Sequence, residues 1–187
     1  MATTSAVGQR LKQLTVIIII FGLPGCGKTY FAKALAHTLC ASYINSDIIR
    51  ESFAEPHRYS LPDKSIVYDM MLTQTLTAMH ECKTVVVDAT FYKENFRRRF
   101  RSYFRDQGML HFIEVVADER LIKNRLARRE DGHADFSVYK LIKKDWDPIQ
   151  FSHLTVQSTD DNLGDMVSKV LEYIKPHIAN QIESDIN

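Results

Sequence analysis

Cysteine is scarce in this chain of 187 residues, where it occurs only at Cys26, Cys40 and Cys82. The odd number argues against a framework of disulfide bonds, and no two of these residues have the C-x-x-C spacing of many zinc sites. Long apolar runs are lacking too, because residues 1–14 are polar and the apolar stretch after them is too brief for a signal or membrane helix. These absences predict a protein of the reducing cytoplasm.

An excess of charge of either sign is also missing. The chain has 24 lysines and arginines against 23 aspartates and glutamates, which gives a net charge of +1. No overall field therefore attracts nucleic acid or a membrane surface, and any such role must depend on a local patch. The length fits one domain with a sizeable core, so residues 1–187 are predicted to form a single domain.

A glycine-rich segment stands between an apolar run, residues 15–21, and a predicted amphipathic helix, residues 28–40. Its pattern, G-x-x-x-x-G-K-[ST], is typical of loops whose backbone N–H groups wrap phosphates at a helix N-terminus. Lys28 would bind the β- and γ-phosphates, and the Thr29 hydroxyl would bind Mg²⁺. The alternative is a glycine-rich turn that binds nothing. The predicted nucleotide-binding residues here are Gly22, Leu23, Pro24, Gly25, Cys26, Gly27, Lys28, Thr29 and Tyr30.

Strands and helices are predicted to alternate along the rest of the chain, with the apolar first strand buried on both faces of a parallel sheet. Ligands of such sheets bind at the carboxyl ends of the strands. Asp47 and Asp88 follow two predicted strand ends, so both should face the same cleft as Lys28. The predicted strands are 15–21, 42–45, 84–88, 111–117 and 153–157; the predicted helices are 28–40, 46–53, 63–81, 93–107, 118–129, 136–146 and 162–179, the last interrupted at Pro176, with a loop at 54–62.

Four segments together resemble one family: residues 22–29, 44–50 (INSDIIR), 85–91 (VVVDATF) and 125–129. They are similar to the predicted ATP-binding kinases related to the kinase domain of polynucleotide kinase, which have a nucleoside-monophosphate-kinase-like P-loop fold. The likeness spans about residues 17–157. It implies a three-layer α/β P-loop NTPase fold, with a five-stranded parallel sheet, helices on both faces and a mobile lid at about residues 126–136. It also implies transfer of the γ-phosphoryl group of ATP, with Mg²⁺, to a hydroxyl.

The resemblance assigns roles to the polar residues near the strand ends. Asp47 would be the general base that accepts the proton of the acceptor hydroxyl, and Arg50 would bind an anionic group of the substrate. Asp88 would orient that arginine or contact metal through water, and Thr90 is a weaker candidate for a hydrogen bond to substrate. The alternatives are that Asp47 and Asp88 only cap a helix or turn and that Arg50 is a solvated surface charge.

Arginines form two further groups. Arg125 and Arg129 lie four residues apart, on one helical face, with the spacing of the lid arginines of the family, and would neutralise charge on the transferred phosphoryl group. The alternative is a solvated basic face. The predicted helix 93–107 carries Phe96, Phe100 and Phe104 on one stripe, expected in the core, and Arg97, Arg101 and Arg105 on another, expected mainly at the surface. Arg97 or Arg98, nearest the strand end, is a candidate for substrate contact, with Arg97 preferred.

The favoured function is an ATP-dependent kinase whose acceptor is a small molecule, because near-neutral charge disfavours a long nucleic-acid groove and Arg50 suffices for one anionic group. The alternative acceptor is a polynucleotide 5′-hydroxyl. A P-loop ATPase or GTPase switch is a second class, although the chain lacks the Asn-Lys-x-Asp segment of GTPases and is short for a large AAA machine. A non-catalytic ATP-binding module is a third class. Phosphoryl transfer to an added acceptor, compared with hydrolysis without one, separates these classes.

Overall fold

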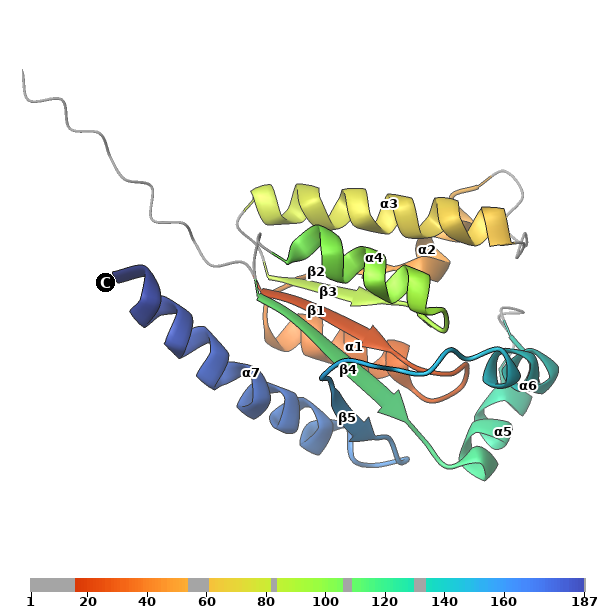
Figure 1. Cartoon of the computed structure of the whole chain (residues 1–187). Helices are drawn as coiled ribbons and strands as arrows, with labels where there is room; N and C mark the ends of the chain where they lie inside the picture. Colours follow the sequence, from red (N-terminus) through yellow and green to blue (C-terminus); the bar gives the residue numbers. More distant parts are fainter. Residues whose placement is uncertain (1–15, 54–60, 82–83, 106–108, 130–133, 187) are drawn as a thin grey trace, which may run out of the picture.

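A computed structural model describes residues 16–53, 61–81, 84–105, 109–129 and 134–186. Five parallel strands form one sheet in the order β2-β3-β1-β4-β5 (Figure 1). The strand at the centre, β1, leads directly into the glycine-rich loop. This arrangement confirms the predicted α/β class with a five-stranded parallel sheet. The strands are β1 (Val16–Phe21), β2 (Ser42–Asn45), β3 (Val85–Asp88), β4 (Met109–Val116) and β5 (Leu154–Gln157).

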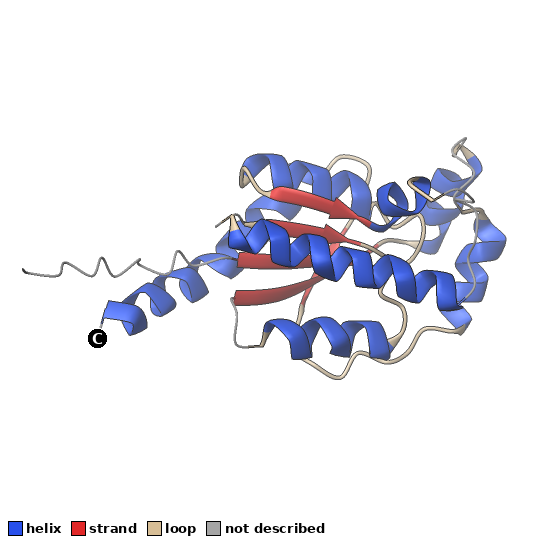
Figure 2. Cartoon of the chain, turned by 90° about the horizontal axis from the view of Figure 1, so that it is seen from above, coloured by secondary structure: helices blue, strands red, loops and turns tan. Residues whose placement is uncertain are grey.

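Helices cover both faces of the sheet, so the molecule has three layers (Figures 1 and 2). Helices α3 and α4 pack on one face, α1 and α7 pack on the other, and α5 and α6 lie beyond the carboxyl ends of the strands. Within the described part of the chain, no helix is long and apolar enough to cross a membrane. The helices are α1 (Lys28–Thr38), α2 (Ser46–Glu51), α3 (Leu61–His80), α4 (Glu94–Phe104), α5 (Glu119–Ala127), α6 (Phe136–Lys144) and α7 (Leu163–Ile186).

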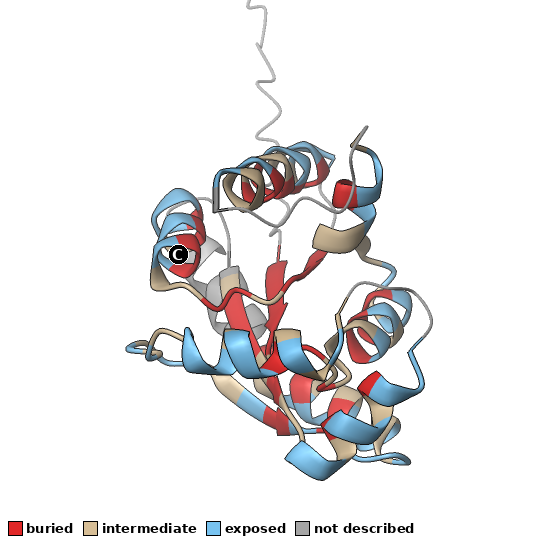
Figure 3. Ribbon diagram, turned by 90° about the vertical axis from the view of Figure 1, so that its right-hand side faces the viewer, coloured by how far each residue is buried: buried red, intermediate tan, exposed pale blue. Residues whose placement is uncertain are grey.

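Strand β1 is apolar throughout because both of its faces are buried. Ile17, Ile19 and Phe21 join the hydrophobic cluster under α3 and α4, and the alternate residues join the cluster under α1 and α7. Burial of each such side chain contributes about 1.5–3 kcal/mol. Figure 3, which looks onto the carboxyl ends of the strands, shows the buried sheet surrounded by helices with exposed outer faces.

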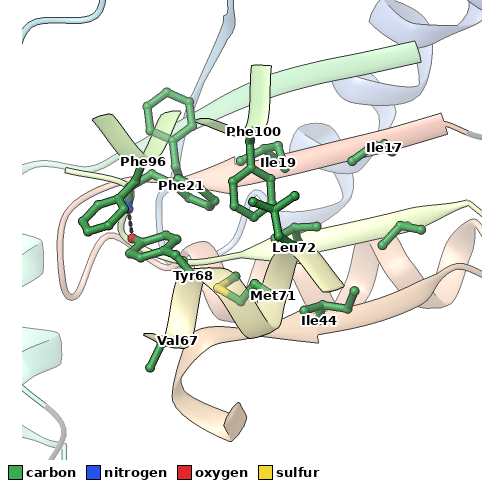
Figure 4. Packing of buried hydrophobic residues seen from close by; sticks show 14 of the residues in the cluster. Ile17, Ile19, Phe21, Ile44, Val67, Tyr68, Met71, Leu72, Phe96 and Phe100 are labelled. Carbon is green, nitrogen blue, oxygen red and sulfur yellow. Dashed lines mark hydrogen bonds between the residues drawn. The ribbon is translucent and has the colours of Figure 1, made fainter. Parts of the chain in front are cut away.

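The aromatic stripe of α4 packs in the core, as predicted. Phe96, Phe100 and Phe104 are all buried. Tyr68 of α3 stacks on Phe96 with ring centroids 4.0 Å apart (Figure 4), so the two helices on this face are joined by aromatic contacts.

Two predictions that concern prolines were wrong. Helix α3 begins at Leu61, so Pro62 is helical rather than part of a loop. Proline is tolerated there because an N–H in the first turn has no helical partner to lose. Helix α7 continues through Pro176 to Ile186 instead of being interrupted. Pro176 and Glu172 are both exposed, so the carbonyl freed by the proline faces water. The rest of the predicted loop, residues 54–60, lies outside the described residues.

Candidate active site

The glycine-rich loop is held closely by the elements around it. Gly25 and Gly27 have φ angles of 78° and 94°, which side chains other than glycine rarely adopt. A Cβ atom at Gly25 would lie 2.8 Å from Leu126 Cγ, and one at Gly27 would lie 2.7 Å from Ser158 Oγ. The two glycines therefore permit both the turn and the close approach of α5 and of the segment after β5.

Arg125 connects α5 to that loop. Its guanidinium group donates to Cys26 O (3.3 Å), Ser158 Oγ (3.0 Å) and Thr159 O (2.6 Å). These bonds hold Arg125 against the loop, so it is not part of a freely solvated basic face. Arg129 lies two residues after the end of α5, beyond the helix that was predicted to include it, and borders the same hollow as Gly25 and Gly27.

A buried polar network joins the ends of β2 and β3. The Tyr43 hydroxyl and the Asn45 amide both donate to Asp88 Oδ2, at 2.8 and 2.7 Å. Asp88 is fully buried, and burial raises the pKa of its carboxyl group, although Lys28 acts in the opposite direction. Asp88 is joined to the neighbouring strand, β2, through Tyr43 and Asn45.

The same Asn45 positions the next helix. Its Oδ1 accepts from the backbone N–H groups of Asp47 (2.9 Å) and Ile48 (3.0 Å), so Asn45, rather than Asp47, is the N-cap of α2. The Asp47 carboxylate is left to accept from Arg50 Nη1 at 3.0 Å. Arg50 is only 7 % exposed, which excludes a solvated surface charge.

The chain after β3 is also fixed. Phe91 has φ 48°, in the left-handed region, and its N–H donates to the Tyr68 hydroxyl at 2.9 Å, which the dashed line in Figure 4 marks. Thr90, just before this turn, faces the same cavity as Asp47. Tyr68 of α3 therefore fixes the backbone next to Thr90, just after the end of β3.

Three hollows lie side by side at this edge of the sheet. The inner cavity, about 250 Å³, is bordered by Lys28, Asp47, Arg50, Thr90 and Arg129. The P-loop hollow, about 180 Å³, is bordered by Gly25, Gly27, Lys28, Thr29, Arg125 and Arg129. The outer hollow, about 330 Å³, is bordered by Gly27, Tyr30, Arg125, Ser158 and Asn162.

The order of the hollows follows from the residues they share. The inner cavity and the P-loop hollow share Lys28 and Arg129. The P-loop hollow and the outer hollow share Gly27, Tyr30 and Arg125. Among the described residues, none borders both the inner cavity and the outer hollow. The P-loop hollow is therefore the middle of the three.

Several residues of the inner cavity were not predicted from the sequence. Lys64 and Tyr68 come from α3, and Tyr92 comes from the segment after β3. Helix α6 adds an apolar wall. Nothing in the sequence distinguishes these positions from ordinary helix residues, because their convergence depends on how α3 and α6 pack around the strand ends. The apolar residues of α6 at the cavity are Val138, Leu141 and Ile142.

Arg97 does not lie where the sequence suggested. It is fully buried and donates to Phe91 O and Asp147 O, both at 2.8 Å, and to Pro148 O at 2.9 Å. It borders none of the three hollows. The guanidinium group satisfies backbone carbonyls of two loops, so Arg97 holds the scaffold and we do not include it in the substrate site. Of the predicted lid, residues 130–133 lie outside the described residues.

The donor set suits a magnesium ion bound with phosphates. Asp88 Oδ1 is buried and has no hydrogen-bond partner within the described part of the chain. The Thr29 hydroxyl is close enough to lower the pKa of Asp88. A hydroxyl and a carboxylate oxygen are ligands that Mg²⁺ accepts, directly or through water, beside substrate phosphates. Thr29 and Asp88 are therefore the residues that would hold the ion.

The sheet order, the loop before Lys28 and the three adjoining hollows define a P-loop nucleotide-binding fold of the kind found in kinases. The chain belongs to the AAA domain family, whose match extends over residues 17–148. This membership and the fold confirm the relationship inferred from the four sequence segments.

Solved structures of kinases have the same fold. A gluconokinase from Sinorhizobium meliloti 1021 superposes with a TM-score of 0.69 at 17% identity, over 91% of this chain and 98% of that one. A sugar kinase from Janibacter sp. HTCC2649 has a TM-score of 0.68 at 13% identity, over 86% and 95%. The APS kinase of Mycobacterium tuberculosis, in complex with AMPPNP and APS, has a TM-score of 0.67 at 16% identity, over 87% and 98%. No curated protein matches the sequence significantly.

Proposed function

We propose that this protein is a kinase that transfers the γ-phosphoryl group of ATP to a hydroxyl of a small molecule. The observation that carries the proposal is the order of the three hollows. The outer hollow would hold the nucleoside, the P-loop hollow the phosphates and the inner cavity the acceptor. The two residues common to the P-loop hollow and the inner cavity, Lys28 and Arg129, are both cations. Lys28 and Arg129 would therefore lie between the phosphate site and the acceptor site, where the γ-phosphoryl group is transferred.

The side chains of the inner cavity suit this reaction. The Asp47 carboxylate can accept the proton of an acceptor hydroxyl, and the Asn45 cap and Arg50 hold it in place. Lys28 and Arg129 would neutralise the charge that a loose transition state spreads over the γ-phosphoryl oxygens. Thr29 and Asp88 would hold Mg²⁺, which supplies further neutralisation at the β- and γ-phosphate oxygens.

Two observations favour a small acceptor over a nucleic-acid end. The inner cavity, at about 250 Å³, is close to the lower limit of small-ligand pockets. Two arginines of α4, Arg98 and Arg101, and the C-cap Arg105 border a separate hollow with Phe112 and Phe151, and none of them borders the inner cavity. Arg99 of α4 forms an ion pair with Asp69 and does not border the inner cavity either. The gluconokinase and APS kinase that share the fold are named for small-molecule acceptors, which supports the same class here.

The test is phosphoryl transfer from labelled ATP, with Mg²⁺, to a panel of acceptors: gluconate, other polyols and sugars, APS, and a 5′-hydroxyl oligonucleotide. We expect transfer to at least one small acceptor to exceed hydrolysis in water, and Lys28→Ala to abolish it. Hydrolysis that no acceptor diverts would indicate an ATPase, and ATP binding without turnover would indicate a non-catalytic module. Transfer to the oligonucleotide alone would replace the small acceptor with a nucleic-acid end.

A further inference from the structure

We infer that the molecule in the inner cavity carries, besides its hydroxyl, an oxyanion that Lys64 binds. This inference rests on the proposed function, because it concerns the acceptor side of the same site. It adds to the site a residue, Lys64, for which the sequence suggested no role.

Among the described residues that line the inner cavity, cationic side chains outnumber anionic ones. Asp47 is the one anion among its described lining residues, and it already accepts from Arg50 at 3.0 Å. Lys28 and Arg129 also border the P-loop hollow, where a triphosphate would neutralise them. Lys64 remains, and no carboxylate of the described chain lies within ion-pair distance of it. The cationic lining residues are Lys28, Arg50, Lys64 and Arg129.

Lys64 and Lys93 both lie near the aromatic ring of Tyr92, but their ionic partners differ. Lys64 Nζ donates to the Tyr92 hydroxyl at 3.0 Å and lies 4.6 Å from the ring centroid. Lys93 Nζ lies 5.5 Å from that centroid, but two carboxylates neutralise it, Asp145 at 2.7 Å and Asp147 at 3.3 Å. Of these two lysines, only Lys64 borders the inner cavity, and its hydrogen bond is to a tyrosine hydroxyl instead of a carboxylate of the described residues.

The ammonium group of Lys64 is also held in position. Tyr92 is only 4 % exposed, so its ring and hydroxyl form a fixed support for a partly buried lysine stem. An ammonium group has three donors, of which the Tyr92 hydroxyl takes one. The other two N–H donors can bind an oxyanion. Its negative charge would neutralise the ammonium group, which is costly to bury without a partner.

Helix α6 contributes apolar side chains to the inner cavity, in contrast to the cationic side chain of Lys64. Its residues at the cavity are apolar, and Leu141 is 68 % exposed, so much of its apolar surface is uncovered. Such a wall suits the hydrocarbon part of a ligand. The chemical class is therefore a small hydroxy acid, or a hydroxyl-bearing phosphate ester, with an apolar portion.

The inference is tested by binding, without turnover, in the presence of AMPPNP and Mg²⁺. Calorimetry compares matched probes that differ only in the anionic group: gluconate with glucitol, glucitol 6-phosphate with glucitol, and 4-hydroxyphenylacetate with 4-hydroxyphenethyl alcohol. We expect the wild-type protein to bind the anionic member of at least one pair about tenfold more tightly, as for one charge-assisted contact. The carboxylate and phosphate pairs distinguish the two kinds of oxyanion.

Variants then assign the preference to Lys64. Lys64→Met keeps the apolar stem over Tyr92 and should remove the preference while leaving the neutral probe unaffected. Lys64→Arg should retain it. Lys175→Met, on the exposed surface of α7, is the matched control and should behave as wild type. Thermal unfolding checks that each variant folds.

The outcomes separate this inference from the proposed function. A wild-type protein that prefers the anionic member of no pair overturns the inference, even if it phosphorylates a neutral acceptor. A Lys64→Met variant that weakens both members equally also overturns it. A preference that depends on Lys64 without phosphoryl transfer to any acceptor would support the anion site and reject the kinase.

Discussion

Among single residues, Asn45 connects two parts of the site. Its amide donates to the buried Asp88 carboxylate and its carbonyl caps α2, so one side chain joins the end of β3 to the helix that carries Asp47. The sequence marks Asp47 and Asp88 because carboxylates after strand ends are conspicuous. It gives little sign of Asn45, whose role depends on the pairing of β2 with β3.

The role of Asp47 is tested by Asp47→Asn, which keeps the shape of the side chain and removes the proton acceptor. We expect turnover to fall about 10²- to 10⁴-fold, the usual contribution of a general base, while ATP affinity is retained. Steady-state rates and ATP titrations measure the two quantities. Asp165→Asn, at an exposed position in α7, is the control. Normal turnover combined with a lower melting temperature would show that Asp47 has a structural role only.

Asp88 gives a prediction about pH. Because burial raises the pKa of this carboxyl group in the folded state, the unfolded chain releases the proton more readily. Its contribution to stability is therefore complete below its unfolded pKa of about 3.9 and is lost as pH rises through the higher folded value. Asp88→Asn cannot titrate, so the melting temperature of this variant should rise relative to that of wild type as the pH increases from about 4.

That comparison is made by thermal unfolding in buffer with a chelator, so that metal binding does not contribute. Asp165→Asn again serves as the control and should show no such gain, because Asp165 is exposed. A difference between Asp88→Asn and wild type that stays constant over this pH range would contradict the prediction.

Among the elements, α5 and the glycine-rich loop fit together most closely. Gly27→Ala would place a Cβ atom 2.7 Å from Ser158 Oγ and 3.1 Å from Arg125 Nη1, on a backbone with φ 94°. We expect a loss of stability of at least about 1–2 kcal/mol from the backbone conformation alone, together with loss of ATP binding. Denaturant unfolding and ATP titration measure these effects.

Gly164→Ala is the matched control for that change. Nothing lies within 4 Å of a Cβ atom at Gly164, which is in α7, so alanine there should be neutral or stabilising. Equal stability and equal ATP affinity of the two variants would show that the loop tolerates side chains and is not a phosphate cradle.

Helices α5 and α6 should respond to nucleotide. Arg125 and Arg129 border the P-loop hollow and α6 borders the inner cavity, so a bound triphosphate would tie these elements to the loop. Hydrogen exchange with and without AMPPNP should show greater protection in peptides covering residues 119–129 and 134–144 than in peptides of α3. Unchanged protection of both helices would reject closure of a lid over ATP.

At the scale of the whole molecule, the sheet was predictable because its central strands, β1 and β3, are short apolar runs and the other strands alternate with helices. The glycine-rich loop was predictable because the chemistry of phosphate binding demands a fixed spacing. Arg97 was harder to interpret, since periodicity placed it on a polar stripe while the loops at residues 91 and 147–148 bury it. Lys64 was not foreseeable, because a lysine in the first turns of a helix looks the same whether it faces water or a cavity.

The position of β1 has a consequence for synthesis of the chain. Its partners, β3 and β4, end at residues 88 and 116, so the strand that bears the loop cannot be paired on both edges until well over half of the chain has been made. Ser158, which contacts Arg125 and lies close to Gly27, is synthesised after both of these strands. Contacts so distant in sequence form slowly, and a nascent chain with an unpaired apolar strand is exposed to aggregation. Nucleotide affinity should therefore appear on the ribosome only after the last strand has emerged, which makes ATP a late rather than an early ligand of the folding chain.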